Sequence, residues 1–310
     1  MDNIFEVYLY EFSQFLAKQE RSPITISGYK NDICLLKKWV FLSKNQQFTL
    51  DQLTSELVKE YKQFLINKDA HPRTISRRLA SIAIFALWAQ SAGYIAEGPN
   101  PVQGTHSIKN VIVAPRWLTD REKVQLIRVV NEEVTRSMLR LPRLGIIILR
   151  DATIVKVLVN TGLRIGELSN LKIADIHLEK NHGVIIVRSG KGSKRREIPL
   201  NLEARKAINL YLRMRSDFSD EMLFLDQDGS QIEKRTAQRA VSRFAKIAGL
   251  KGVSCHTLRH TFAKNLIDQN VSIEKVSLLL GHTNLNTTKI YITPSRNYLE
   301  DAVAKLDPVE

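Results

Sequence analysis

The stretch of sequence that decides the fold is HTLRHTFA, residues 256–263. His256 and Arg259 lie three positions apart, which places both side chains on one face of a helix. Further along the chain come LLGH, which ends at His282, and TTKIYI, which contains Tyr291. This part of the chain therefore carries, in order, a histidine, an arginine, a second histidine and a tyrosine on short helices.

Two motifs precede this segment and add positive charge to it. Residues 161–168 read TGLRIGEL and place Arg164 at the start of a helix, just after a glycine. Residues 183–188 and 195–200 read as the two strands of a β-hairpin. The tip of the hairpin, SGKGSK, holds Lys191 in a glycine turn. We therefore predict an α+β C-terminal domain with a small antiparallel β-hairpin or sheet.

These residue types suit the cleavage of a DNA phosphodiester without a metal ion. The transition state carries extra negative charge on its nonbridging oxygens, and guanidinium groups stay protonated and offer those oxygens a planar fork of donors. A nucleophile must attack phosphorus, and a proton must reach the leaving 5′ oxygen. A tyrosine hydroxyl, with an ordinary pKa of about 10, is a weak nucleophile unless such charges surround it. We therefore predict a phosphoryl-transfer site with no metal and no cofactor.

Taken together, TGLRIGEL, the GKG turn, HTLRHTFA, LLGH and the tyrosine of TTKIYI closely resemble the tyrosine recombinase (phage integrase) family. The resemblance is greatest to the compact Xer-like and integrase members, and it covers most of residues 119–295. It implies that Arg164 and Arg259 clamp the scissile phosphate and that His282 hydrogen-bonds it. Lys191 matches the hairpin lysine that protonates the leaving oxygen, with Lys194 in the same loop as the alternative.

The resemblance also assigns the nucleophile and its helpers. Tyr291 matches the tyrosine that forms a 3′-phosphotyrosyl bond, whereas Tyr298 comes too late in the chain and is expected to pack in the tail. His256 matches the proton acceptor or donor of that tyrosine, and Glu167 matches an acidic position that supports the first arginine. His256 and His260 are also spaced like metal ligands, but the zinc-protease pattern requires a glutamate directly after the first histidine, and a threonine stands there. We expect His260 to make a structural or backbone contact.

The chain as a whole is predicted to be mainly α-helical. Periodic apolar residues predict four N-terminal helices, over residues 4–18, 23–42, 54–67 and 72–93. Residues 96–117 contain three prolines and two glycines and predict a linker. Helices are expected after it near residues 119–134, 147–160, 165–172, 202–214 and 234–248, with a last helical group over 257–303.

The family resemblance turns this pattern into a domain prediction. Residues 1–95 would form a SAM-like four-helix core-binding domain, and residues 118–310 the catalytic domain with a C-terminal tail. The two would close as a clamp on a DNA duplex. The tail, with Leu299, Val303 and Leu306 at helical spacing, would pack on its own domain or on a neighbouring subunit.

Basic residues outside the motifs are candidates for contacts with DNA, and a solvated surface is the alternative. They lie on the fourth N-terminal helix, around the hairpin tip and on the helix over 234–248. The candidates are Arg73, Arg77, Arg78, Lys194, Arg195, Arg196, Arg235, Arg239 and Arg243.

The overall composition agrees with a nucleic-acid partner. The net charge of +14 favours a polyanion, either DNA or RNA or an anionic membrane. The longest strongly apolar run, residues 144–149, is too short to cross a bilayer, and the N-terminus does not read as a signal peptide. The two cysteines form no disulfide framework. We therefore expect a cytoplasmic, nucleoid-associated protein that binds double-stranded DNA and no membrane.

The family works as a homotetramer on two DNA sites, with or without a partner recombinase or accessory protein. Its members serve chromosome-dimer resolution, phage integration and plasmid or transposon movement with one kind of active site, so the motifs leave these roles open. Three rivals remain. A type IB topoisomerase would relax plasmids that lack any special site, an accessory DNA-binding protein would tolerate Tyr291→Phe, and a metal-dependent nuclease would be sensitive to chelator.

Overall fold

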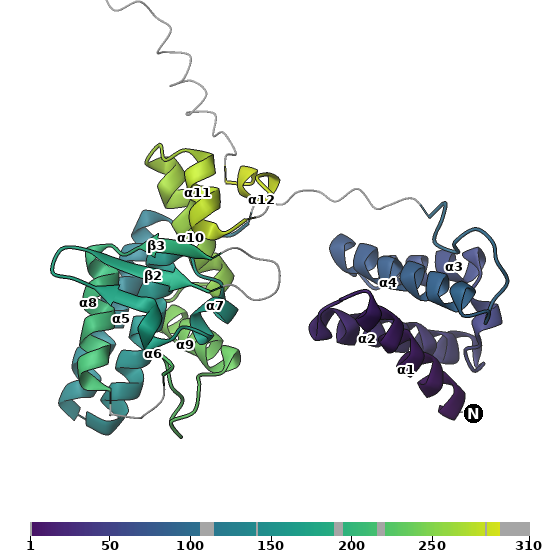
Figure 1. Ribbon diagram of the computed structural model, residues 1–310, viewed down its shortest axis with the longest axis horizontal. Coiled ribbons are helices and arrows are strands. Elements are labelled where there is room, and N and C mark those ends of the chain that lie inside the picture. The colour runs from purple at the N-terminus through teal and green to yellow at the C-terminus, as the bar shows by residue number, and fades with distance from the viewer. Residues whose placement is uncertain are drawn as a thin grey trace, which may run out of the picture. The chain divides into compact units, whose positions relative to one another are not determined.

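Figure 1 shows the computed structural model, in which the chain forms two compact units, Met1–Ile112 and Val113–Glu310. The structure describes residues 2–105, 115–140, 142–188, 195–215, 221–282 and 284–291. Within these ranges the protein is mainly helical and contains one three-stranded antiparallel sheet, which confirms the predicted fold class. No helix of the described ranges is long and apolar enough to cross a membrane.

The first unit, within residues 2–105, contains four α-helices close to the predicted ones. They are α1 (Asp2–Lys18), α2 (Pro23–Lys44), α3 (Ser55–Asn67) and α4 (Pro72–Ser91). The helix starts follow from local chemistry. At the start of α2 the Ser22 hydroxyl accepts a hydrogen bond from the amide of Thr25, and a proline occupies the first position, where its missing N–H costs nothing.

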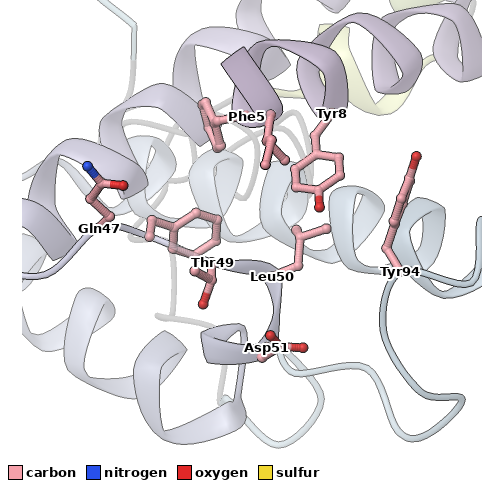
Figure 2. Close-up of a pocket in the computed structure, with 9 residues that line it drawn as sticks. Phe5, Tyr8, Gln47, Thr49, Leu50, Asp51 and Tyr94 are labelled. Carbon is pink, nitrogen blue, oxygen red and sulfur yellow. The ribbon is translucent and has the colours of Figure 1, made fainter. Parts of the chain in front are cut away.

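Aromatic side chains fill the core of this first unit. Phe12 and Phe85 are fully buried, with ring centres 5.1 Å apart. A separate pocket of about 250 Å³ opens beside α1, with Phe5 and Tyr8 on one wall and Tyr94 at one end (Figure 2). None of the candidate catalytic side chains lines this pocket. The four helices therefore share a hydrophobic core of their own.

The first part of the predicted linker packs on the first unit, and the residue that directly follows the linker packs in the second unit. The side chain of Asn100 donates to the carbonyl of Ala83 on α4. At the other end, the amide of Leu118 donates to the hydroxyl of Thr261 in the second unit. Residues 106–114, between these anchors, lie outside the described part of the chain.

The second unit is built around one central helix. Its described helices are α5 (Asp120–Arg140), α6 (Pro142–Thr161), α7 (Ile165–Ser169), α8 (Leu202–Met214), α9 (Lys234–Ile247), α10 (Cys255–Asp268), α11 (Ile273–Leu280) and α12 (Asn286–Lys289). Helix α6 packs against α5, α8, α9 and α10 (Figure 1). The apolar run predicted to be too short for a membrane therefore forms part of a buried core helix.

The sheet contains one strand more than the predicted hairpin. Strands β2 (Gly183–Val187) and β3 (Arg196–Pro199) pair antiparallel as expected, and β1 (Ile176–Leu178) pairs with the other edge of β2. The three residues of β1 are too few to show a period of two in the sequence. The hairpin tip, residues 189–194, lies outside the described residues.

Helix lengths in the second unit also differ from the prediction. Helix α5 continues to Arg140 because Val134 and Met138 pack against the core. Helix α6 begins at Pro142, several residues earlier than expected, since proline is well tolerated at a first helical position. Helix α7 ends at Ser169, so it is shorter than the predicted 165–172.

Candidate active site

The site is organised around the C-terminal end of α11, where the LLGH motif lies. Gly281 adopts a left-handed conformation with φ +64° and ends the helix. Its amide donates to the carbonyl of Leu278, and the amide of His282 donates to the carbonyl of Ser277. This bonding pattern satisfies two carbonyls of the last turn and is the reason for a glycine at this position.

Three arginines satisfy the carbonyls that follow. Each of three consecutive carbonyl oxygens accepts a hydrogen bond from a different guanidinium: Leu279 from Arg196 at 2.9 Å, Leu280 from Arg259 at 2.8 Å, and Gly281 from Arg164 at 3.0 Å. The negative end of the helix dipole favours positive charge here. The end of α11 thus draws together guanidinium groups from the residue before α7, from β3 and from α10.

Arg259, on α10, is the most buried of the three and is 4% exposed. Its second nitrogen donates to the carbonyl of Gly162 at 2.6 Å, so the guanidinium bridges the TGLR turn and the end of α11. Gly162 has φ +63°, and a β-carbon there would lie 2.4 Å from the ring of Phe262. Burial and the charge of Arg164 lower the pKa of Arg259 to about 10. The guanidinium therefore stays charged at neutral pH.

Glu167 joins two of these arginines from the other side. Arg164 donates to its carboxylate at 2.9 Å, and Arg196 donates to both carboxylate oxygens at 2.9 and 2.8 Å. Burial alone would raise the pKa of Glu167, but the hydrogen bonds from Arg196 and from the Arg164 amide bring that pKa below its usual value. Three guanidinium groups and one carboxylate leave a surplus of positive charge, which suits an anion such as a phosphate.

Tyr291 lies two residues beyond the last residue of α12 and is 2% exposed. Its hydroxyl oxygen is 2.6 Å from Nδ1 of His260 on α10. Burial raises the pKa of Tyr291, and the nearby charge of Arg259 offsets part of that effect. The predicted nucleophile is therefore close to the buried arginine and in contact with a histidine.

His282 lies beside the arginines, as expected. Its Nδ1 is 2.8 Å from the hydroxyl of Thr288, which fixes the orientation of the ring. Burial, followed by the charges of Arg259 and Arg164, lowers the pKa of His282 to about 4. The ring is consequently neutral at physiological pH and can donate a hydrogen bond to a phosphate through one nitrogen.

The remaining predicted residues divide into two groups. His256 is exposed on α10, and its ring centre lies 6.5 Å from that of His260. Lys191, its alternative Lys194, Tyr298 and the predicted tail lie outside the described residues. Within the described residues no group of three or more His, Cys, Asp or Glu side chains gathers to hold a metal ion.

Two residues of the site were not assigned from the sequence. His260 contacts the tyrosine hydroxyl, although only a structural or backbone contact was expected of it. Its position four residues after His256, on the same helix face, was the available signal. Arg196 was predicted to contact DNA beside an exposed hairpin tip, but its side chain is 9% exposed and pairs with Glu167. Arg196 lies two residues before buried Ile198 on β3, so strand alternation points it inward.

The other candidates for DNA contact differ in their surroundings. Arg73, Arg235 and Arg239 are exposed. Four more form local pairs: Arg77 with buried Asp32, Arg78 with the Tyr61 hydroxyl, Arg195 with Glu197, and Arg243 with Asp151. Arg77, Arg195 and Arg243 are nevertheless more than a third exposed, so pairing leaves part of each side chain on the surface.

Comparison with known protein families shows which family this chain belongs to. The family model described as "Phage integrase family" matches residues 117–297, which contain every residue of the site. The chain belongs to the phage integrase family. A second model, "Phage integrase SAM-like domain", matches residues 4–108 and therefore the four-helix unit.

Relatives of this integrase-family chain include tyrosine recombinases, and the match covers most of the length of both chains. Tyrosine recombinase XerA of Pyrococcus furiosus is 32% identical, over 97% of this chain and 94% of its own. Tyrosine recombinase XerC of Corynebacterium glutamicum is 28% identical, over 93% and 87%. The protein is thus an enzyme of the tyrosine recombinase type.

Solved structures show the same fold. The Tn1549 transposon integrase in complex with a circular intermediate DNA superposes with a TM-score of 0.73, at 19% identity, over 95% of this chain and 99% of its own. At that identity the likeness concerns the fold alone.

Proposed function

We propose that this protein breaks and rejoins DNA strands at a specific site through a 3′-phosphotyrosyl bond to Tyr291. The observation that carries this proposal is the meeting of Arg164, Arg259 and His282 with the hydroxyl of Tyr291 around the end of α11. Two guanidinium groups and a neutral imidazole suit the charged oxygens of a phosphate in the transition state.

Each side chain has a distinct task in the reaction. Arg164 and Arg259 hold the scissile phosphate, with Glu167 fixing the orientation of Arg164, and His282 donates a hydrogen bond to it. Tyr291 attacks phosphorus, and Lys191 protonates the 5′ oxygen as it leaves. The 5′ hydroxyl of another strand then attacks the phosphotyrosine and reverses the step. The bond energy is kept in the covalent intermediate, so neither ATP nor a metal is required.

Double-stranded DNA is the proposed partner, because the chain carries a net charge of +14 and its fold resembles that of an integrase solved with DNA. Arg73, Arg235 and Arg239 are exposed candidates for this contact, and Arg77, Arg195 and Arg243 keep more than a third of their side chains exposed beside their ion pairs. Phosphate contacts of this kind release counterions, so the affinity should fall steeply with salt. A dissociation constant that stays flat between low and physiological salt would contradict a phosphate-based interface.

We further propose that the chain acts in the cytoplasm as a homotetramer on two DNA sites. One exchange needs two pairs of strands, and each subunit supplies one tyrosine. Light scattering of complexes with a bound duplex would measure four protein chains per two duplexes. A complex that cleaves efficiently as one chain on one duplex would favour the monomeric topoisomerase instead.

The deciding experiment traps the covalent intermediate. A nicked duplex, carrying the sequence that wild-type protein selects from random duplexes, loses a short strand after cleavage and cannot be rejoined. Wild-type protein in excess chelator should form an adduct that survives denaturation, and Tyr291→Phe should bind the duplex without forming one. Adduct formation by Tyr291→Phe would refute the assignment of the nucleophile. Tight, specific binding with no adduct from either protein would indicate an accessory DNA-binding protein.

A further inference from the structure

One contact of the nucleophile has no counterpart in the roles proposed so far. The hydroxyl of Tyr291 lies 2.6 Å from Nδ1 of His260, and the two ring centres are 5.5 Å apart. With its proton on Nε2, the imidazole accepts a hydrogen bond from the hydroxyl through Nδ1. We propose that His260 is the proton acceptor for Tyr291 in strand cleavage and returns the proton in rejoining. This inference rests on the proposed function.

The step balances without any added reactant. As the phenolic oxygen attacks, its O–H bond breaks, the proton moves to Nδ1 of His260, and the new bond to phosphorus forms. The bond from phosphorus to the 5′ oxygen breaks, and that oxygen takes a proton from Lys191. In rejoining, the attacking 5′ hydroxyl gives its proton back to Lys191 as its oxygen bonds to phosphorus. The bond from phosphorus to the tyrosine oxygen breaks, and that oxygen recovers its proton from the His260 imidazolium.

The surroundings of His260 keep it in the form that a base requires. The titratable and charged groups acting on it are His256 and Arg259 on its own helix, together with His282 and Tyr291. Burial, then His256 and Arg259, lower the pKa of His260 to about 4. At neutral pH the ring is therefore uncharged, with a nitrogen lone pair available.

The nucleophile, in turn, needs such an acceptor. Burial raises the pKa of Tyr291, so the hydroxyl keeps its proton at neutral pH. His256, the residue to which the family resemblance assigns proton transfer, is exposed, and its ring centre is 6.5 Å from that of His260. The ring in direct contact with the hydroxyl is that of His260.

The test separates a chemical role from a structural one by the choice of variant. His260→Asn places an amide oxygen close to the position of Nδ1, so it retains a hydrogen-bond acceptor but removes the basic group. His177→Asn is the matched control, because His177 is an exposed histidine on β1 of the same unit. Thermal unfolding of both variants establishes that they fold.

The assay measures single-turnover adduct formation on a nicked duplex whose leaving 5′ oxygen is replaced by sulfur. A thiolate leaves without a proton, so the pH profile reports only the nucleophile's side of the reaction. Wild type and His177→Asn should give a nearly flat rate from about pH 6 to about pH 8, since the base is already neutral there. His260→Asn should react roughly 10²- to 10⁴-fold more slowly at neutral pH, with a rate that rises about tenfold per pH unit as hydroxide replaces the base.

Two results would overturn the proposal. A folded His260→Asn protein with the wild-type rate and a flat profile would show that the contact is structural. A faster reaction would show that His260 restrains the tyrosine at rest. A wild-type protein that forms no adduct on any selected duplex would instead refute the proposed function itself.

Discussion

Replacing Arg196 by methionine should destabilise the second unit far more than any change at the neighbouring exposed arginine. Arg196 makes two hydrogen bonds to Glu167, at 2.9 and 2.8 Å, and a third to the carbonyl of Leu279 at 2.9 Å. Its side chain is 9% exposed and that of Glu167 is 16% exposed. Methionine fills a similar volume but leaves the carboxylate and the carbonyl without these donors.

The expected loss of stability follows from the buried Glu167 carboxylate that the substitution leaves without its partner Arg196. Removing one partner of a buried ion pair costs about 3–5 kcal/mol, because the other charge stays buried. Glu167 keeps its bonds to Arg164, so we expect the lower end, about 3 kcal/mol. In a unit of this size each kcal/mol lowers the melting temperature by about 2–4 °C, which gives a shift of about 6–12 °C.

Calorimetry of the full chain is the assay, with the transition of the second unit followed separately from that of the first. Arg195→Met is the matched control, since Arg195 is 66% exposed and its pair with Glu197 is worth little in water. Arg195→Met should shift the transition by about 4 °C at most. An equal shift of the melting temperature in the two variants would refute the inference that the buried contacts of Arg196 stabilise the second unit.

Three further results are expected. Gly281→Ala should lower the free energy of unfolding, measured with denaturant, by at least about 1–2 kcal/mol and by more than Gly249→Ala does. Both glycines have a positive φ, but only at Gly281 would the added β-carbon meet a guanidinium, that of Arg196, at 2.8 Å. Folding lowers the pKa values of His260 and His282 to about 4, so between that pH and about pH 6.5 the unfolded chain binds protons more readily than the folded chain. The thermal stability should therefore be full above about pH 6.5 and fall toward pH 4, by on the order of 1 kcal/mol for each half-buried ring. An unchanged melting temperature at about pH 5 would contradict this. Phe85→Ala should destabilise the first unit by about 3–5 kcal/mol and leave the second transition in place, whereas loss of both transitions together would show that the units unfold as one.

The sequence predicted best those features whose causes are local. Helices α2 and α4 begin at Pro23 and Pro72, where the chemistry of a few neighbouring residues decides the helix start. Strand β1 and the full length of α6 were not predicted. Strand β1 exists because Ile176 and Leu178 pair with β2. Such features are decided by partners distant in sequence, which no periodicity in a short window records.

The same distinction applies within the site. Arg164, Arg259, His282 and Tyr291 carry motif signals, and the structure brings all four together. Arg196 carries the same charge as its exposed neighbour; strand alternation points it inward, but its bond to Leu279, far along the chain, is seen only in the structure. The sequence of a hairpin flank cannot show which of two adjacent arginines meets a helix end.

The hydrogen bonds at the end of α11 explain why arginine suits the two proposed phosphate-binding positions better than lysine does. A guanidinium has five N–H donors in a rigid plane, whereas an ammonium group has three on a flexible stem. Arg259 uses one donor on Gly162 and one on Leu280, and Arg164 uses one on Glu167 and one on Gly281. Each group is thus held by protein acceptors while further donors remain for an anion. In the proposed mechanism, a phosphate binds without releasing these contacts, and the charges proposed to stabilise the transition state are oriented before DNA arrives.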